Sequence, residues 1–325
     1  VLAGGLLIFL LSSIAIAFAD SIWTLSGLRL LQAIGGSAGP VLGRAMVRDI
    51  HGPEESARLL SYIATAMALA PAAAPILGGY MTVWFGWHAI FVFLAGYGLL
   101  GLLILSLLIP ETAPAEARHP ISTRRLLHNY GQLLRHPTWL WYTLCCSFVF
   151  AGLFSFLSGS SFVIIDFLGY GEEEYGLLFA LVVLGFMAGT LIAGKMGRRF
   201  GIDRLIGAGS VVAAAGGALM ALLALLEIYS AAAVVGPHML YMVGVGIVMP
   251  QSMAGALAPF PGIAGTSSAL LGFIQMASAA LIGLFVGHYH DGTPRSMAVS
   301  IAVVGTLTLL SFLVLIRRRG VDLVE

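Results

Sequence analysis

Long apolar runs constrain this chain more than any other feature. A helix needs about 20 apolar residues to cross the hydrocarbon core of a bilayer. Strands do not fit these runs, because the runs lack period-two alternation and a bilayer offers no water to open sheet edges. We therefore predict an all-α membrane protein. Ten spans are expected, at 1–18, 22–47, 59–82, 87–109, 138–164, 175–195, 204–226, 231–250, 263–287 and 296–316.

The composition agrees with a lipid environment. Of the 325 residues, 59% are hydrophobic and only 10% are charged, against about 25% charged in a soluble domain. The formal net charge of +1 gives no support to nucleic-acid binding. Cys145 and Cys146 are adjacent within an apolar run, so we interpret them as small core residues and not as a disulfide or a metal site.

The distribution of Lys and Arg predicts the orientation. Cations gather near 48–58, 110–137, 195–204 and 317–319, whereas the alternating connections carry only Arg295 and several acids. Positive charge favours the cytoplasmic side. We therefore expect a multi-pass protein of the cytoplasmic (inner) membrane with its C-terminus in the cytoplasm.

The polar stretch 110–137 divides the chain. Within it, 121–135 is predicted to form a short amphipathic helix on the inner surface. The expected organisation is a partial N-terminal bundle of four spans at 1–109, a cytoplasmic linker at 110–137, and a six-span C-terminal bundle with a short basic tail at 138–325. Because the chain starts inside an apolar run, we expect a fragment of a longer protein. Two equal six-span halves would place two further spans before Val1.

Arg29 is a charge inside an apolar span, which costs several kcal/mol and usually serves function. Gln32 is three residues away and shares its helix face. Gly35, Gly39 and Gly43 form a ridge of small residues that permits close helix packing. We predict that Arg29 and Gln32 are a buried polar pair facing a water-filled cavity. The alternative is that Arg29 extends about 9 Å along the helix to the headgroups near Trp23.

Two further segments have unusual glycine and proline content. Pro71, Pro75 and Gly79 share a face of one span, next to Gly78. The prolines predict a kink, which is either purely structural or a hinge or seal between moving helices.

The segment 194–201 is expected in a short cytoplasmic loop, with Gly194 and Gly201 permitting a tight turn and Arg198 and Arg199 capping the preceding helix. The alternative is plain positive-inside topology. It is not a phosphate-binding loop, because no strand precedes it.

Aromatic, sulfur and amide side chains recur in the second half. Phe154, Met242, Gln275 and Met276 are candidates for a cavity that accepts varied apolar ligands. Lipid-facing side chains would give the same pattern. His288, His290 and Asp291 are not predicted to bind a metal, because no other ligand converges there. The sequence has no Ser-His-Asp set and no metal-spaced His/Cys set, so an enzyme is not expected.

Taken together, these motifs resemble the major facilitator superfamily, and within it the bicyclomycin/multidrug-resistance (Bcr/CflA) branch of drug:proton antiporters. The resemblance covers most of the chain. The segments that carry it are 28–36, 47–49, 69–79, 84–87, 110–112, 194–201 and 259–272.

The resemblance implies a two-bundle transporter of twelve spans, of which ten are present here. Arg29 matches an arginine linked to proton transfer. Pro71, Pro75, Gly78 and Gly79 match the antiporter motif, and Gly194, Arg198, Arg199 and Gly201 match a gating loop.

The implied function is export of small, largely apolar drug-like molecules in exchange for protons, by a monomer that needs no cofactor beyond the proton gradient. The alternatives are an exporter of an endogenous metabolite such as an amino acid or sugar, and an inactive truncation or non-transporting membrane protein. If the protein exports drugs in exchange for protons, Arg29 would favour ionisation of a carboxylate in a span that precedes the chain.

Overall fold

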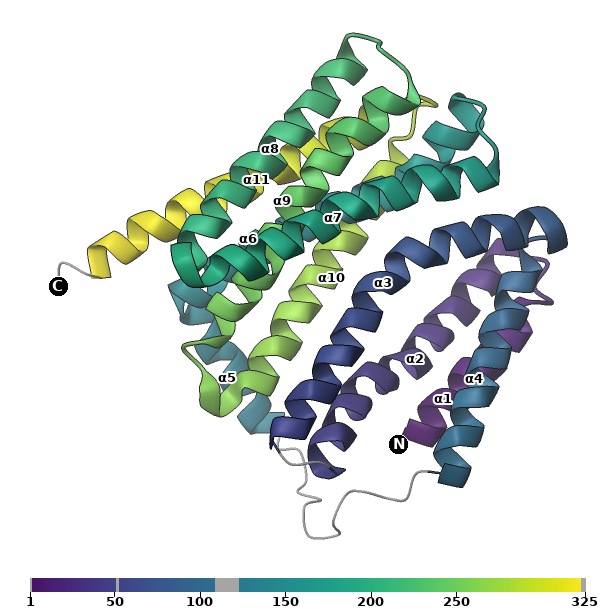
Figure 1. Ribbon diagram of the computed structural model, residues 1–325, viewed down its shortest axis with the longest axis horizontal. Helices are drawn as coiled ribbons and strands as arrows, with labels where there is room; N and C mark the ends of the chain where they lie inside the picture. The colour runs from purple at the N-terminus through teal and green to yellow at the C-terminus, as the bar shows by residue number, and fades with distance from the viewer. Residues whose placement is uncertain (1, 51–52, 109–122, 323–325) are drawn as a thin grey trace. The chain divides into compact units, whose positions relative to one another are not determined.

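The computed structural model describes residues 2–50, 53–108 and 123–322, and all of its regular elements there are helices (Figure 1). They form two compact units, Val1–Pro120 and Ile121–Glu325. The division falls inside the predicted linker 110–137. The predicted all-α class is confirmed for the described residues.

The predicted number of spans is not confirmed. Seven of the described helices are long and apolar enough to cross a membrane. The first helix has only 15 residues, a length of about 22 Å against a hydrocarbon core of about 30 Å. In the second helix, Arg29 and Gln32 lower the hydropathy of an otherwise apolar segment. Ten therefore stays a prediction, although each predicted span overlaps a helix.

The first unit contains four helices, and one of them lies between two others. The bounds are α1 (Leu2–Ile16), α2 (Ile22–Ile50), α3 (Pro53–Phe85) and α4 (His88–Leu108). Helix α1 packs against both α2 and α4. Its closest approach to α2 is at Gly35, where an added Cβ would lie 2.6 Å from the backbone nitrogen of Phe9. The Phe9 ring lies between Gly36 of α2 and Gly98 of α4.

The second unit is arranged around α9. Its elements are α5 (Thr123–Arg135), α6 (Pro137–Ser161), η2 (Phe162–Phe167), α7 (Glu172–Phe200), α8 (Ile202–Leu225), α9 (Ala231–Leu257), η3 (Pro261–Ile263), α10 (Ala264–His288) and α11 (Arg295–Asp322). Helices α6, α7 and α8 all pack on α9, and α11 packs on α6 and α8. Helix α6 continues into the π-helical segment η2, where Leu168 N donates to Val163 O.

Small residues explain how so many helices approach α9. An added Cβ at Gly244 would lie 2.6 Å from the carbonyl oxygen of Gly209 on α8, and Gly246 lies against Phe186 on α7. Near the other end, Gly255 lies against the ring of Tyr142 on α6. Helix packing within lipid depends on such close contacts, because lipid removes the hydrophobic driving force between helices.

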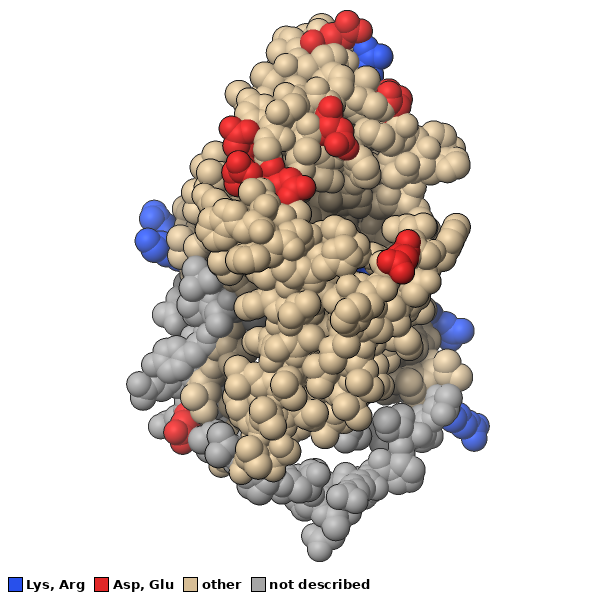
Figure 2. Space-filling model, turned by 90° about the vertical axis from the view of Figure 1, so that its right-hand side faces the viewer, with Lys and Arg blue, Asp and Glu red and all other residues tan. Residues whose placement is uncertain are grey.

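The outer surface is apolar. Figure 2 shows few charged residues on the face in view, which is mostly tan. Large apolar side chains are exposed along the helices, among them Leu107 at 77%, Phe273 at 70% and Leu284 at 71%. A water-soluble protein rarely exposes so much apolar surface, so this exterior fits acyl chains.

Candidate functional site

Arg29 and Gln32 meet in the structure and form part of a hydrogen-bond chain. Arg29 Nη1 donates to Gln32 Oε1 at 2.8 Å, and Gln32 Nε2 donates to Ser13 Oγ on α1 at 2.7 Å. Ser13 Oγ in turn donates to the carbonyl oxygen of Phe9 at 2.6 Å. Since a guanidinium can only donate, this order fixes the Gln32 amide with its oxygen towards Arg29.

The chain of hydrogen bonds leads from an exposed charge into a buried interface. Arg29 is exposed, Gln32 is 4% exposed and Ser13 is fully buried. The ring of Phe91 on α4 lies 5.5 Å from the Arg29 guanidinium carbon, a cation–π distance. Arg29, Gln32 and Phe9 line an open hollow of about 510 Å³.

This geometry bears on the alternative that Arg29 reaches the headgroups. Gln32 is one turn further from Trp23 than Arg29 is, so the guanidinium points away from that helix end. Within the described part of the chain, Arg29 has no carboxylate partner. Its charge is therefore held by one amide and one aromatic ring.

Among the described residues, the glycine ridge of α2 makes a close contact at one position, Gly35. Gly35 lies against α1, whereas an added Cβ at Gly39 or Gly43 would meet no atom within 4 Å. The α1–α2 contact at Gly35 brings the two backbones close enough for Gln32 to reach Ser13. Ser13 and Phe91 were not identified from the sequence, because they belong to other helices and carry no motif.

The proline segment lies within α3. Pro75, Gly78 and Gly79 are half-buried, and the Gly78 carbonyl accepts a hydrogen bond from Thr82 Oγ1 at 2.8 Å. The side chain of Pro71 lies outside the described residues. Figure 1 shows α3 bent along its length, as prolines inside a helix would cause. The proposed hinge role stays a prediction.

The expected loop at 194–201 is wrong. Helix α7 continues through Phe200, and α8 begins at Ile202. Gly201 alone makes the turn, with a φ of 78° that favours glycine. Glycine inside a helix costs only about 1 kcal/mol, so Gly194 and Gly197 do not end it. Arg199 is exposed near this end, and the side chain of Arg198 lies outside the described residues.

A hydrogen bond next to this turn was not predicted. Tyr142 on α6 donates a 2.5 Å hydrogen bond to Oδ1 of Asp203, in the first turn of α8. The ring of Tyr142 also lies against Gly255 of α9. Tyr142 therefore links three helices next to the turn at Gly201.

The four predicted cavity residues do not face one direction. Met242 is buried inside the bundle, and Gln275 is 7% exposed, with its amide 3.6 Å from Met249 Sδ. Met276 is 55% exposed and Phe154 is half-buried. Gln275 and Met276 are neighbours on α10 and so point about 100° apart. Their roles stay predictions.

A buried histidine on α9 was not predicted. The imidazole of His238 is fully buried and stacks between Phe156 at 3.9 Å and Tyr241 at 5.5 Å, with interplanar angles of 8° and 9°. Neither ring nitrogen has a hydrogen-bond partner. Tyr241 OH donates to Val149 O at 3.0 Å.

At the connection between α10 and α11, Asp291 is part of a turn. It accepts hydrogen bonds from the hydroxyl and backbone N–H of Thr293, at 2.7 and 2.9 Å. These bonds, the hydroxyl first, lower the pKa of Asp291. Its carboxylate is occupied by this local turn.

The family model of the major facilitator superfamily matches residues 1–284. This chain belongs to the major facilitator superfamily. It is a multi-pass membrane transporter, as the apolar helices and the family together require.

Relatives and a solved structure support the assignment. The bicyclomycin resistance protein homolog of Haemophilus influenzae is 27% identical over 97% of this chain and 79% of its own length. Multidrug resistance protein D of Escherichia coli is 24% identical over 97% of this chain and 78% of its own. A bacterial homologue of the human lysosomal transporter Spinster shares the fold, with a TM-score of 0.72, 16% identity, and coverage of 97% of this chain and 82% of that one.

Proposed function

We propose that this transporter exports small, largely apolar drug-like molecules across the cytoplasmic membrane in exchange for protons. The observation that supports this most is the chain from Arg29 through Gln32 to Ser13, which holds a charge beside an open hollow. The printed names of the relatives in Haemophilus influenzae and Escherichia coli, bicyclomycin resistance and multidrug resistance, support the substrate class.

The proposed role of Arg29 follows from elementary electrostatics. A cation held beside a hollow favours the ionised form of any carboxylate that comes next to it. A proton and a substrate then compete for that carboxylate. Gln32 positions the guanidinium from one side and Phe91 covers it from another, so the charge keeps a fixed place while the transporter changes conformation.

Alternating access is the mechanism that the family fold suggests. In transporters built from repeated bundles, the bundles move against each other around a substrate site. We propose the same for this chain, with the bend of α3 and the turn at Gly201 as the places where helices yield. The C-terminus is proposed to lie in the cytoplasm.

Proton-driven efflux in proteoliposomes tests the proposal. Full-length protein is reconstituted, a pH gradient is imposed, and efflux of a lipophilic fluorescent dye is measured. Arg29→Ala is expected to slow proton-driven efflux about tenfold, or about 1.4 kcal/mol. Arg29→Lys is expected to recover only part of the rate, because an ammonium does not reproduce the planar guanidinium.

The matched control is Arg295→Ala. Arg295 is half-buried and pairs with Glu227 at 2.5 Å, so this variant also removes one arginine. Unchanged proton-driven efflux in Arg29→Ala would contradict the proposal. A response to one polar solute such as an amino acid or sugar, with none to apolar dyes, would favour export of an endogenous metabolite.

A further inference from the structure

Helix α5 presents three different faces. Leu133 is fully buried, and Tyr130, one turn earlier, is half-buried. Leu127 and Leu134, two turns apart, are 63% and 48% exposed. Arg124, His128 and Arg135 are exposed and fall within about 40° of one another around the helix. The sequence of α5 contains no acidic residue.

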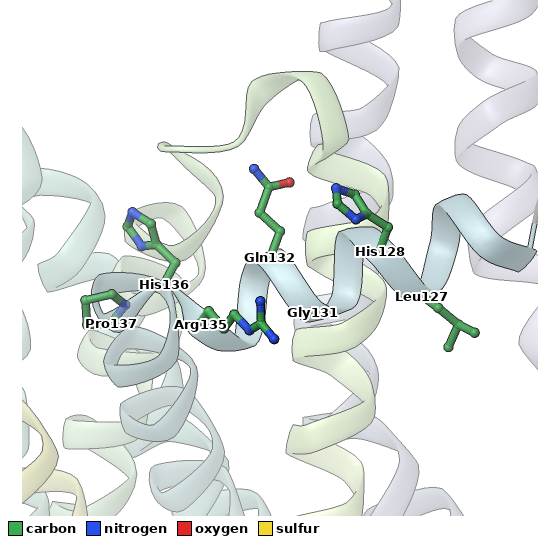
Figure 3. Close-up of a pocket in the computed structure, with 7 residues that line it drawn as sticks. All are labelled: Leu127, His128, Gly131, Gln132, Arg135, His136 and Pro137. Atoms are coloured by element: carbon green, nitrogen blue, oxygen red, sulfur yellow. The ribbon is translucent and has the colours of Figure 1, made fainter.

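The exposed side chains of α5 point in different directions around the helix. Leu127, His128 and Arg135 are among the residues that line an open cavity of about 570 Å³. In Figure 3, His128, Gln132 and His136 point to one side of α5 and Leu127 points to the other. Helical spacing places Arg124 and Arg135 between Leu127 and Gln132, within about 80° of Leu127. An exposed leucine is stable against acyl chains and not against water. The side that carries Leu127 is therefore the side that faces lipid, and the row of Arg124, His128 and Arg135 borders it.

The position of α5 directly before α6 in the chain indicates how deeply α5 lies in the bilayer. It ends at Arg135, and α6, one of the membrane-spanning helices, begins at Pro137. Helix α5 therefore runs beside the point where α6 enters the bilayer. With leucines towards the acyl chains, a long arginine side chain reaches the level of the lipid phosphates.

Arg135 is suited to binding a phosphate. Within the described residues it has no ion-pair or hydrogen-bond partner, and neither does Arg124. A guanidinium binds phosphate through two parallel hydrogen bonds. A row of cations with no acid on the same helix attracts an anionic headgroup more strongly than a zwitterionic one.

We propose that α5 is a binding site for anionic phospholipid of the inner leaflet. Arg135 binds the lipid phosphate, Arg124 extends the same basic row, and Leu127 and Leu134 contact the acyl chains. Gln132 faces water on the side away from the leucines. This site is independent of the proposed proton-coupled export.

Native mass spectrometry of the purified full-length protein tests this site. The protein is titrated with phosphatidylglycerol and, separately, with phosphatidylcholine of the same acyl chains. The expected result is a preference for phosphatidylglycerol, to which each of the two arginines contributes about fivefold. Arg124→Gln combined with Arg135→Gln should abolish the preference, and Arg135→Gln alone should reduce it about fivefold.

Two further variants sharpen the test. Arg204→Gln removes an exposed arginine from α8 and should leave the preference unchanged. Leu127→Ser with Leu134→Ser should weaken binding of both lipids alike. Equal binding of the two lipids by the wild type, or an equal loss in Arg204→Gln and Arg135→Gln, would overturn the proposal. Displacement of phosphatidylglycerol by millimolar inorganic phosphate would overturn it too, since it would indicate a site for a free anion.

Discussion

Two polar clusters lie within the helices of this transporter, and they differ in hydrogen bonding and in exposure. In the first unit, Arg29, Gln32 and Ser13 satisfy one another and reach an open hollow. In the second, His238 is enclosed between Phe156 and Tyr241, and both of its ring nitrogens lack partners. The first cluster holds a charge at an open hollow, and the second is fully enclosed by the bundle.

This difference in hydrogen bonding and exposure predicts a different role for each cluster. Burying an unpaired polar group costs about 1–3 kcal/mol, so His238 lowers stability unless its aromatic contacts offset that cost. A satisfied polar chain that ends at an exposed arginine costs far less. We therefore expect substitutions near His238 to change stability, and substitutions along the Arg29 chain to change transport.

The largest effect is expected from Gly244→Ala, which tests how closely α9, the helix that carries His238, packs against α8. The added Cβ would lie 2.6 Å from the carbonyl oxygen of Gly209 and 2.7 Å from Ala213 Cβ. Backbone atoms cannot move aside, so the free energy of unfolding should fall by about 3 kcal/mol. Thermal denaturation in detergent measures this.

Gly236→Ala on the same helix is the control. An added Cβ there meets no atom within 4 Å, and alanine is the better helix former by about 0.5–1 kcal/mol. The two variants should therefore shift the melting temperature in opposite directions. Equal shifts would show that α9 is not packed as closely as described.

The next largest effect is expected from Gln32→Leu, which breaks the polar chain at its middle. Arg29 loses a charge-assisted hydrogen bond of about 1.5 kcal/mol, a low value because water reaches the exposed guanidinium. Ser13 keeps its hydrogen bond to Phe9, so the protein should still fold. Proton-driven efflux should fall about tenfold, with an unchanged melting temperature. Loss of stability without loss of coupling would remove the contrast between the clusters.

A smaller effect of opposite sign is expected from His238→Phe. Phenylalanine keeps the stack with Phe156 and Tyr241 and removes two unpaired nitrogens. Unfolding should become about 1 kcal/mol less favourable, and proton-driven efflux should not change. Denaturation and the efflux assay are measured on the same preparation. If efflux instead stops while the fold persists, His238 belongs to a proton pathway.

The smallest effect is expected from Phe91→Leu. It removes the ring that lies 5.5 Å from the Arg29 guanidinium carbon and leaves the hydrogen bond to Gln32. An exposed cation–π contact contributes about 0.5 kcal/mol, so proton-driven efflux should change about twofold. Phe91→Tyr keeps the ring and should behave as the wild type. A loss as large as that of Gln32→Leu would mean that Phe91 has another role.

Helix positions were largely predictable from the sequence, since each predicted span overlaps one helix. The ends were less so: α3 was expected at 59–82 and extends over Pro53–Phe85. Apolar runs report only the part of a helix in hydrocarbon, and helices continue into the polar interface. The predicted amphipathic stretch 121–135 agrees closely with α5, because its leucines and cations alternate with helical spacing.

The candidate site was predictable only in part. Arg29 and Gln32 were found because a charge in an apolar run is conspicuous and because helical spacing places them together. Ser13 and Phe91 were not found, since serine and phenylalanine are common in spans and their contacts join separate helices. His238 was missed for the same reason. The loop expected at 194–201 was wrong because glycine was taken to end the helix, although a helical glycine costs only about 1 kcal/mol.

The π-helical segment that follows α6 indicates one extra residue in the chain at this point. The hydrogen bond from Leu168 N to Val163 O spans one residue more than an α-helical bond, which is what one extra residue at the end of α6 would produce. Deleting one residue there is expected to restore an unbroken α-helix and to leave the buried half of α6 in register. Homologous chains should therefore differ in length by one residue at this point without any change in topology.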